Sequence, residues 1–210
     1  MPANRPSTRN RRGRAAAAVA LIGLVCPRAE AHLVTTGLGP VYDGIAHLAV
    51  SPVDLAVVAV LTLLAAMRGP RQARWLLAVL PASWLLGGFG GLISPVEASL
   101  GWATGLSFLL AGALVAADRD LPLPVVLALA GVIGALHGYL TGAALAQTPR
   151  APLELTGTLV ALIVLVTLLA GLVVSVRRFA VRVAVRVMGS WIAATGLLVI
   201  GWSLRAGSLK

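Results

Sequence analysis

The chain has 210 residues, of which 59% are hydrophobic and 11% are charged. Soluble domains are usually about half apolar and about a quarter charged. The composition excludes disorder over most of the length, because disordered chains are poor in apolar residues. It also excludes an ordinary soluble domain, which could not cover so much apolar surface. The fold class that remains is all-α, a polytopic membrane helix bundle.

The formal net charge is +10, from 17 lysines and arginines against 7 acidic residues. Five arginines lie in the first 14 residues, and most of the others fall in short gaps between apolar runs. This distribution is typical of the positive-inside rule, so no nucleic-acid partner is expected. Cys26 is the only cysteine, which excludes an intrachain disulfide and a cysteine-based metal cluster.

The N-terminal segment has the three regions of a secretory signal peptide. Residues 1–14 are polar and basic, residues 15–25 form an apolar run, and Ala29-Glu30-Ala31 is an A-x-A cleavage site. We therefore expect a signal peptide at 1–31 and a single transmembrane domain at 32–210. The alternative is an uncleaved anchor, although the apolar run is short for a span, which needs about 20 residues.

Six apolar segments follow, each close to the length that a bilayer requires. Because the backbone must satisfy its own hydrogen bonds in lipid, we expect about six transmembrane helices. The short gaps predict that sequential helices are neighbours. The segments are 51–67, 75–93, 98–117, 124–146, 153–176 and 187–204.

Basic residues in the gaps predict the orientation. Eight arginines fall on one side, whereas only Arg150, Arg205 and Lys210 remain on the other after cleavage. We expect a multi-pass protein of the inner (cytoplasmic) membrane whose mature N-terminus lies on the outer face. The eight are Arg68, Arg71, Arg74, Arg119, Arg177, Arg178, Arg182 and Arg186.

Glycines recur at four-residue intervals in several segments. Gly134, Gly138 and Gly142 share one face of the fourth segment, and residues 87–91 hold four glycines. The pattern favours close helix packing through small residues. The alternative is a loosened, backbone-lined pathway.

Two polar pairs precede or begin the first span. Asp43 and His47 are four residues apart, so a helix places them on one face. They could bind a cation, or they could form a local hydrogen bond on an outward-facing turn. Ser51 and Asp54 have the spacing of a helix cap, so we interpret Asp54 as a capping residue.

His137 lies well inside the fourth span, where ionisable residues are expensive and usually functional. It could belong to a metal or proton site, or it could be a neutral ring that binds a helix carbonyl. Thr141 lies one turn further along the same face. His32 would be the first mature residue, and its α-amine and imidazole together could chelate a metal. The alternative for His32 is a disordered terminus.

These residues form a candidate metal-ligand set: His32, Asp43, His47 and His137. Imidazole and carboxylate ligands suit nickel, cobalt or zinc. The absence of thiolates and the presence of only 3 methionines argue against copper(I). No tightly bound cofactor is expected, because Ni²⁺ or Co²⁺ would be the transported cargo.

At these residues the sequence resembles the HupE/UreJ family of small membrane proteins. The likeness includes Ala31-His32, Gly44-Ile45-Ala46-His47, His137-Gly138 and the six-span length. The resemblance implies nickel or cobalt uptake for hydrogenase and urease. The sequence departs from the family motifs, which have histidine where Pro40 and Thr141 stand here, aspartate at Ala46 and glutamate at Ala144. It therefore resembles a divergent member with fewer ligands.

Three functions agree with these features. The first is a permease for a divalent transition metal, nickel or cobalt, that works by passive or secondary transport, since no P-loop motif is present. The second is a non-catalytic membrane scaffold or assembly protein of a metalloenzyme system. The third, an intramembrane zinc hydrolase, lacks a general-base glutamate beside a histidine pair. We expect no enzyme activity. The expected partners are the lipid bilayer, the metal ion, and either a second copy of the chain or a metalloenzyme maturation protein.

Overall fold

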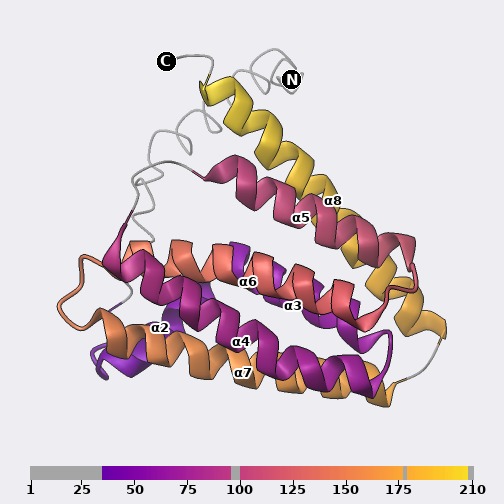
Figure 1. Cartoon of the computed structure of the whole chain (residues 1–210), viewed down its shortest axis with the longest axis horizontal. Helices are drawn as coiled ribbons and strands as arrows, with labels where there is room; N and C mark the ends of the chain where they lie inside the picture. The colour runs from indigo at the N-terminus through magenta and orange to yellow at the C-terminus, as the bar shows by residue number, and fades with distance from the viewer. Residues whose placement is uncertain (1–34, 96–99, 177–178, 208–210) are drawn as a thin grey trace, which may run out of the picture. The chain divides into compact units, whose positions relative to one another are not determined.

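A computed structural model describes residues 35–95, 100–176 and 179–207. These residues form helices throughout, so the predicted all-α class is confirmed (Figure 1). The predicted signal peptide and His32 lie outside the described residues. The helices are α2 (Pro40–Val50), α3 (Pro52–Ala66), α4 (Pro70–Ile93), α5 (Gly101–Ala117), α6 (Leu123–Leu145), α7 (Ala151–Ser175) and α8 (Phe179–Gly207).

Four of the described helices are long and apolar enough to cross a membrane: α4, α6, α7 and the Phe179–Arg205 part of α8. The pair α2 and α3 passes the same test together, but it is bent by 75° at its break. Helix α5 is apolar and has only 17 residues. The chain is therefore a multi-pass membrane protein, and its described residues contain four or five spans by length and apolar character, together with the shorter apolar helix α5.

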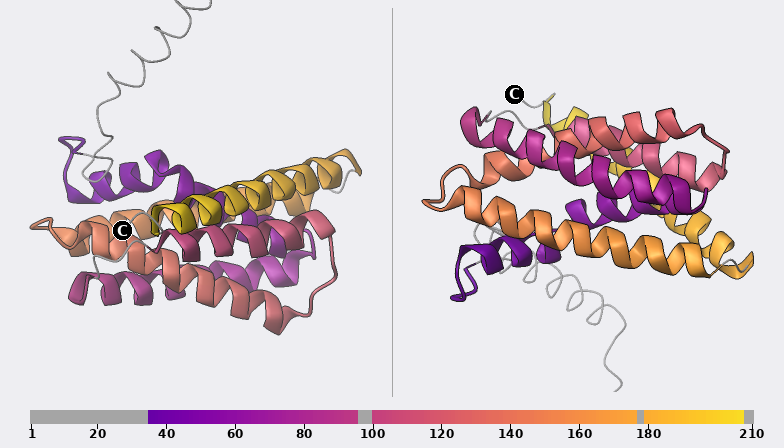
Figure 2. Two further views of the ribbon diagram at one scale, coloured as in Figure 1. Left: turned by 90° about the horizontal axis from the view of Figure 1, so that it is seen from above. Right: turned by 60° about the horizontal axis from the view of Figure 1, so that its bottom comes forward.

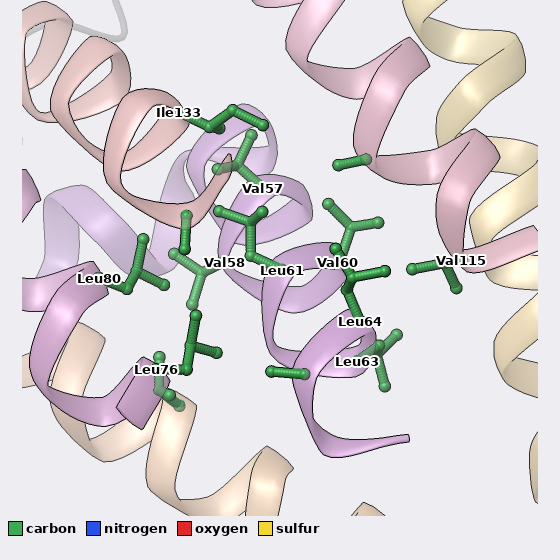
Figure 3. Close-up of a cluster of buried hydrophobic side chains, with 14 of the residues drawn as sticks. Val57, Val58, Val60, Leu61, Leu63, Leu64, Leu76, Leu80, Val115 and Ile133 are labelled. Atoms are coloured by element: carbon green, nitrogen blue, oxygen red, sulfur yellow. The ribbon is translucent and has the colours of Figure 1, made fainter. Parts of the chain in front are cut away.

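The core is built around α3. Nearly every residue from Val57 to Ala66 is buried, and Figure 3 shows Val58, Leu61 and Leu64 pointing toward side chains of the surrounding helices. Leu76 and Leu80 of α4, Val115 of α5 and Ile133 of α6 complete this cluster. A helix that is apolar on all sides is expected at the centre of a bundle.

The most extensive helix contacts are not between sequential helices. Helix α4 packs along α6, α5 along α8, and α2 along α7, and the α5–α8 pair lies side by side in both Figure 1 and Figure 2. The prediction that sequential helices are neighbours holds only in part: α3 contacts α4 and α6 contacts α7, but these contacts are less extensive than those of the three pairs above. Small residues decide the pairing instead, because close packing drives association where every helix face is apolar.

The α4–α6 contact shows this most clearly. A Cβ added at Gly138 would overlap the carbonyl of Trp84, and one added at Gly142 would overlap the carbonyl of Gly88. Gly91 meets the carbonyl of Tyr139 in the same way from the other helix. The packing interpretation of these glycines is confirmed.

Helix α2 ends where α3 begins, at Ser51 and Pro52. The Ser51 hydroxyl accepts a hydrogen bond from the Asp54 amide at 3.3 Å, and proline at the first helical position has no N–H to leave unsatisfied. The predicted cap is therefore confirmed. The break directs Asp54 into the bundle, since only 7% of Asp54 is exposed, whereas its neighbour Val53 is 40% exposed.

Candidate functional site

His137 is fully buried at the centre of α6. Gly138 beside it lets the α4 backbone approach closely. The imidazole lies between two aromatic rings: Phe108 is stacked on it with centroids 6.2 Å apart, and Trp84 is tilted against it at 6.0 Å. Thr141 donates to the His137 carbonyl at 3.0 Å. Helices α4, α5 and α6 therefore fix the orientation of this ring.

Both ring nitrogens of His137 contact side chains. Nε2 lies 3.0 Å from the Ser107 hydroxyl of α5, and Nδ1 lies 3.4 Å from Oδ1 of Asp54 in α3. These two contacts do not match the alternative in which the ring binds a helix carbonyl. The second carboxylate oxygen of Asp54 accepts from the Ser51 hydroxyl at 2.8 Å.

The Ser107 hydroxyl lies within hydrogen-bonding distance of two groups. It is 2.8 Å from the Thr104 carbonyl and 3.0 Å from Nε2 of His137. A hydroxyl has one proton to donate, so two arrangements fit these distances. If the hydroxyl donates to Thr104, it accepts from Nε2–H, and an Nδ1 lone pair faces the Asp54 carboxylate oxygen, where a cation would bind. If it donates to Nε2, the ring proton lies on Nδ1 and is donated to Asp54.

A second polar region lies at the end of the bundle where α2 begins. A pocket of about 290 Å³ is lined by residues from the segment before α2, its first turn, the α6–α7 connection and the first turn of α7. It contains the carboxylates of Asp43 and Glu154 and the guanidinium of Arg150. Asp43 accepts hydrogen bonds from the Thr36 amide and hydroxyl, both at 2.6 Å. This pocket could attract a cation from solution.

The four candidate ligands are not brought together by the described residues. His47 is partly exposed on α2, one turn beyond Asp43, whereas His137 is paired with Asp54. Among the described residues, no three His, Cys, Asp or Glu side chains are close enough to hold one metal ion. His32 lies outside those residues. The structure thus separates Asp43 at one end of the bundle from His137 in its centre.

Sequence reasoning missed the Asp54–His137 pair and the role of Ser107. Asp54 is a capping residue as predicted, but capping uses only its amide and one carboxylate oxygen. The remaining signal was a buried histidine together with an acidic residue at the start of an apolar helix. Pairing them requires knowing that α3 touches α6, which follows only from the three-dimensional packing.

The fold and this site define a class: a polytopic helical membrane protein with a buried imidazole–carboxylate pair beside a broken helix. Residues 19–199 match the HupE/UreJ protein family, so the chain belongs to that family. The family is associated with nickel or cobalt uptake or with urease and hydrogenase maturation. Comparison with curated proteins and with solved structures found no match.

Proposed function

We propose that this protein carries a divalent transition metal, Ni²⁺ or Co²⁺, across the membrane, and that Asp54 and His137 form its intramembrane site. The observation that carries the proposal is the buried imidazole–carboxylate pair, with Nδ1 and Oδ1 3.4 Å apart. In this proposal the Ser107 hydroxyl donates to the Thr104 carbonyl and accepts from Nε2–H, so that the Nδ1 lone pair faces the carboxylate. Transporter sites are commonly built where a discontinuous helix exposes its end inside the bundle. The break between α2 and α3 places Asp54 in this position.

The separation of the two acceptors suits a bridging metal ion. Two ligands about 2.1 Å from a tetrahedral ion lie about 3.4 Å apart, as the usual metal–nitrogen and metal–oxygen distances require. The Ser51 hydroxyl contacts the other Asp54 carboxylate oxygen, so it lies on the Asp54 side of the pair. The borderline metals nickel, cobalt and zinc accept this mixture of imidazole and carboxylate.

Two protein ligands make a weak site, and weakness suits transport. An ion must leave a transport site as readily as it enters, whereas a structural or catalytic metal is held by three or four ligands. This small ligand set supports a role that is not enzymatic. The small ligand set also suits transport of the metal ion down its concentration gradient or under the membrane potential.

We further propose that the metal is captured at the end of the bundle that carries Asp43. The carboxylates of Asp43 and Glu154 line the pocket there, and His47 lies one helical turn deeper along α2. If the leader is removed after Ala31, His32 supplies an α-amine and an imidazole at the same end of the chain. An incoming metal ion would therefore meet these capture ligands first and the Asp54–His137 pair second.

Uptake into liposomes tests the proposal without other proteins. Purified protein is reconstituted around a metal-sensitive dye, and entry of Ni²⁺ and Co²⁺ is followed for the wild type, His137→Asn and Asp54→Asn. We expect entry by the wild type and a loss of at least tenfold in both variants. Thr62→Val is the matched control, because Thr62 is a buried polar residue of α3 whose hydroxyl donates to the Val58 carbonyl within its own helix.

The same experiment distinguishes the assembly role. A folded wild type that passes neither metal, at any concentration up to millimolar, would reject the permease and favour a scaffold in metalloenzyme maturation. Equal uptake by the wild type and both variants would support metal transport by this protein but would reject the Asp54–His137 pair as its site.

A further inference from the structure

The end of the bundle opposite the Asp43 pocket contains a larger cavity. Its volume is about 370 Å³, and it lies between the end of α3, the end of α7 and the start of α8. Two arginines, Arg68 and Arg182, line it together with apolar side chains. This is the end of the protein that the distribution of arginines predicts to be cytoplasmic.

We propose that this cavity binds an anionic phospholipid of the cytoplasmic leaflet, with its phosphate against Arg68 and Arg182. The cavity has the two chemical parts that such a lipid requires. The arginines form the polar part, and the apolar part includes Val174, Val181 and Val185. Basic pockets between transmembrane helices on the cytoplasmic side suit anionic headgroups.

Arg68 is incompletely satisfied by the protein. One guanidinium nitrogen donates to the Leu64 carbonyl at 2.6 Å and another to the carbonyl of Arg119, but Nε is buried without a hydrogen-bond partner among the described residues. Burial lowers the pKa of Arg68, although Asp118 and Asp120 oppose this effect. A bound phosphate would compensate a cation that the protein has partly removed from water.

The charges around the cavity remain positive in sum. Arg182 forms an ion pair with Asp118 at 2.5 Å, and Arg186 donates to the Ala116 carbonyl at 2.9 Å. Arginines outnumber aspartates around the cavity. The arginines include Arg68, Arg119, Arg182 and Arg186, and the aspartates are Asp118 and Asp120. The excess favours an anion over a zwitterionic headgroup.

Exposed apolar surface beside the cavity fits the acyl chains. Phe179, which lines the cavity, is 84% exposed, and Leu172 nearby on α7 is 61% exposed. Free phosphate would use the arginines alone and leave this surface uncovered. The combination therefore identifies an amphiphile rather than a small anion.

Native mass spectrometry and thermal unfolding in detergent test the site. Phosphatidylglycerol, phosphatidylcholine and inorganic phosphate are added separately to the full chain. We expect phosphatidylglycerol alone to stay bound and to raise the unfolding midpoint, and both effects to fall at least fivefold in Arg182→Gln and Arg68→Gln. The matched control is Arg74→Gln, which removes the same charge from an exposed arginine of α4 outside the cavity.

Four results would overturn the proposal. Equal retention of phosphatidylcholine would indicate a nonspecific lipid shell, and equal loss in Arg74→Gln would indicate diffuse surface charge. Full displacement of the lipid by millimolar inorganic phosphate would indicate an anion site only. Val181→Trp fills the cavity without changing a charge, so a folded Val181→Trp variant that still retains phosphatidylglycerol would also reject it.

Discussion

Asp54 and His137 are 83 residues apart in the sequence, yet their side chains meet inside the bundle, with Oδ1 3.4 Å from Nδ1. Asp54 occupies the first turn of α3 and His137 the centre of α6. The start of α3 thus places Asp54. The close contact of Gly138 with α4 helps to place His137, its neighbour on α6. The contact links a local feature of the chain to its tertiary packing.

Substitutions at Asp54 should separate stability from transport. Asp54→Asn keeps the shape, and its amide can donate to Nδ1, so the fold should remain stable while metal uptake is lost. Asp54→Ala removes the carboxylate partner of the Ser51 hydroxyl and leaves Nδ1 of the buried ring unpaired, which costs about 1–3 kcal/mol. Thermal unfolding in detergent measures the stability of each variant, and liposome uptake measures its transport of metal. Equal stability of the two variants would contradict this account of the pair.

Ser107 should act by positioning the ring proton. In Ser107→Ala the acceptor for Nε2–H is lost, and the proton can move to Nδ1, where it donates to Asp54 and blocks the lone pair. Metal uptake should then fall about tenfold, as for other residues that orient a metal-binding histidine. Asn or Thr at position 107 should restore part of the activity, because both supply an acceptor.

Thr141→Val is the control for this prediction, because Thr141 contacts the His137 carbonyl and not its ring. The ring proton can be located directly by ¹⁵N NMR of labelled histidine in the wild type and in Ser107→Ala. An unchanged tautomer in Ser107→Ala would show that the hydroxyl does not set it.

The glycine contacts predict a strong dependence of stability on position. Gly142→Ala should destabilise the protein by several kcal/mol or prevent folding, because the new methyl group overlaps the Gly88 carbonyl of α4 and overpacking forces backbone shifts. Gly171→Ala should be neutral or slightly stabilising, since nothing lies within 4 Å of its Cβ position and alanine is the better helix former. Unfolding midpoints of both variants check the contrast, and similar losses would be unexpected.

The predicted orientation can be tested by labelling. In a Cys26→Ala background, a membrane-impermeant maleimide should label Gln147→Cys from outside the cell and should label Arg71→Cys only after permeabilisation. Both side chains are exposed, and they lie at opposite ends of the bundle. The reverse pattern would place the arginine-rich end outside and would also remove the basis for a cytoplasmic lipid site.

The sequence was sufficient to predict the helical membrane class, the cap at Ser51 and the packing role of Gly138 and Gly142. Hydrogen-bond requirements in lipid and local capping rules act within one segment, so they can be read without knowing the partners. Helix pairing could not be predicted in the same way. Helices α4, α6 and α7 are apolar around most of their circumference, so periodicity does not indicate the face that meets another helix.

Only part of the site could be predicted from the sequence, again because the helix pairing was not known. His137 was recognisable because an imidazole within an apolar span is expensive. Asp54 was assigned only to its cap, because a residue near a helix start has a sufficient local explanation. Ser107 gave no signal at all, since serine is common in close helix contacts. Whether Asp43, His47 and His32 bind metal stays a prediction.

The start of α3 also has an electrostatic consequence. A helix carries about half a positive charge at its N-terminus, and the start of α3 lies close enough to α6 for Asp54 to contact His137. This end of the helix dipole disfavours a cation beside His137. A carboxylate in the first turn opposes the dipole, so a neutral side chain at position 54 would leave the dipole unopposed at the buried pair.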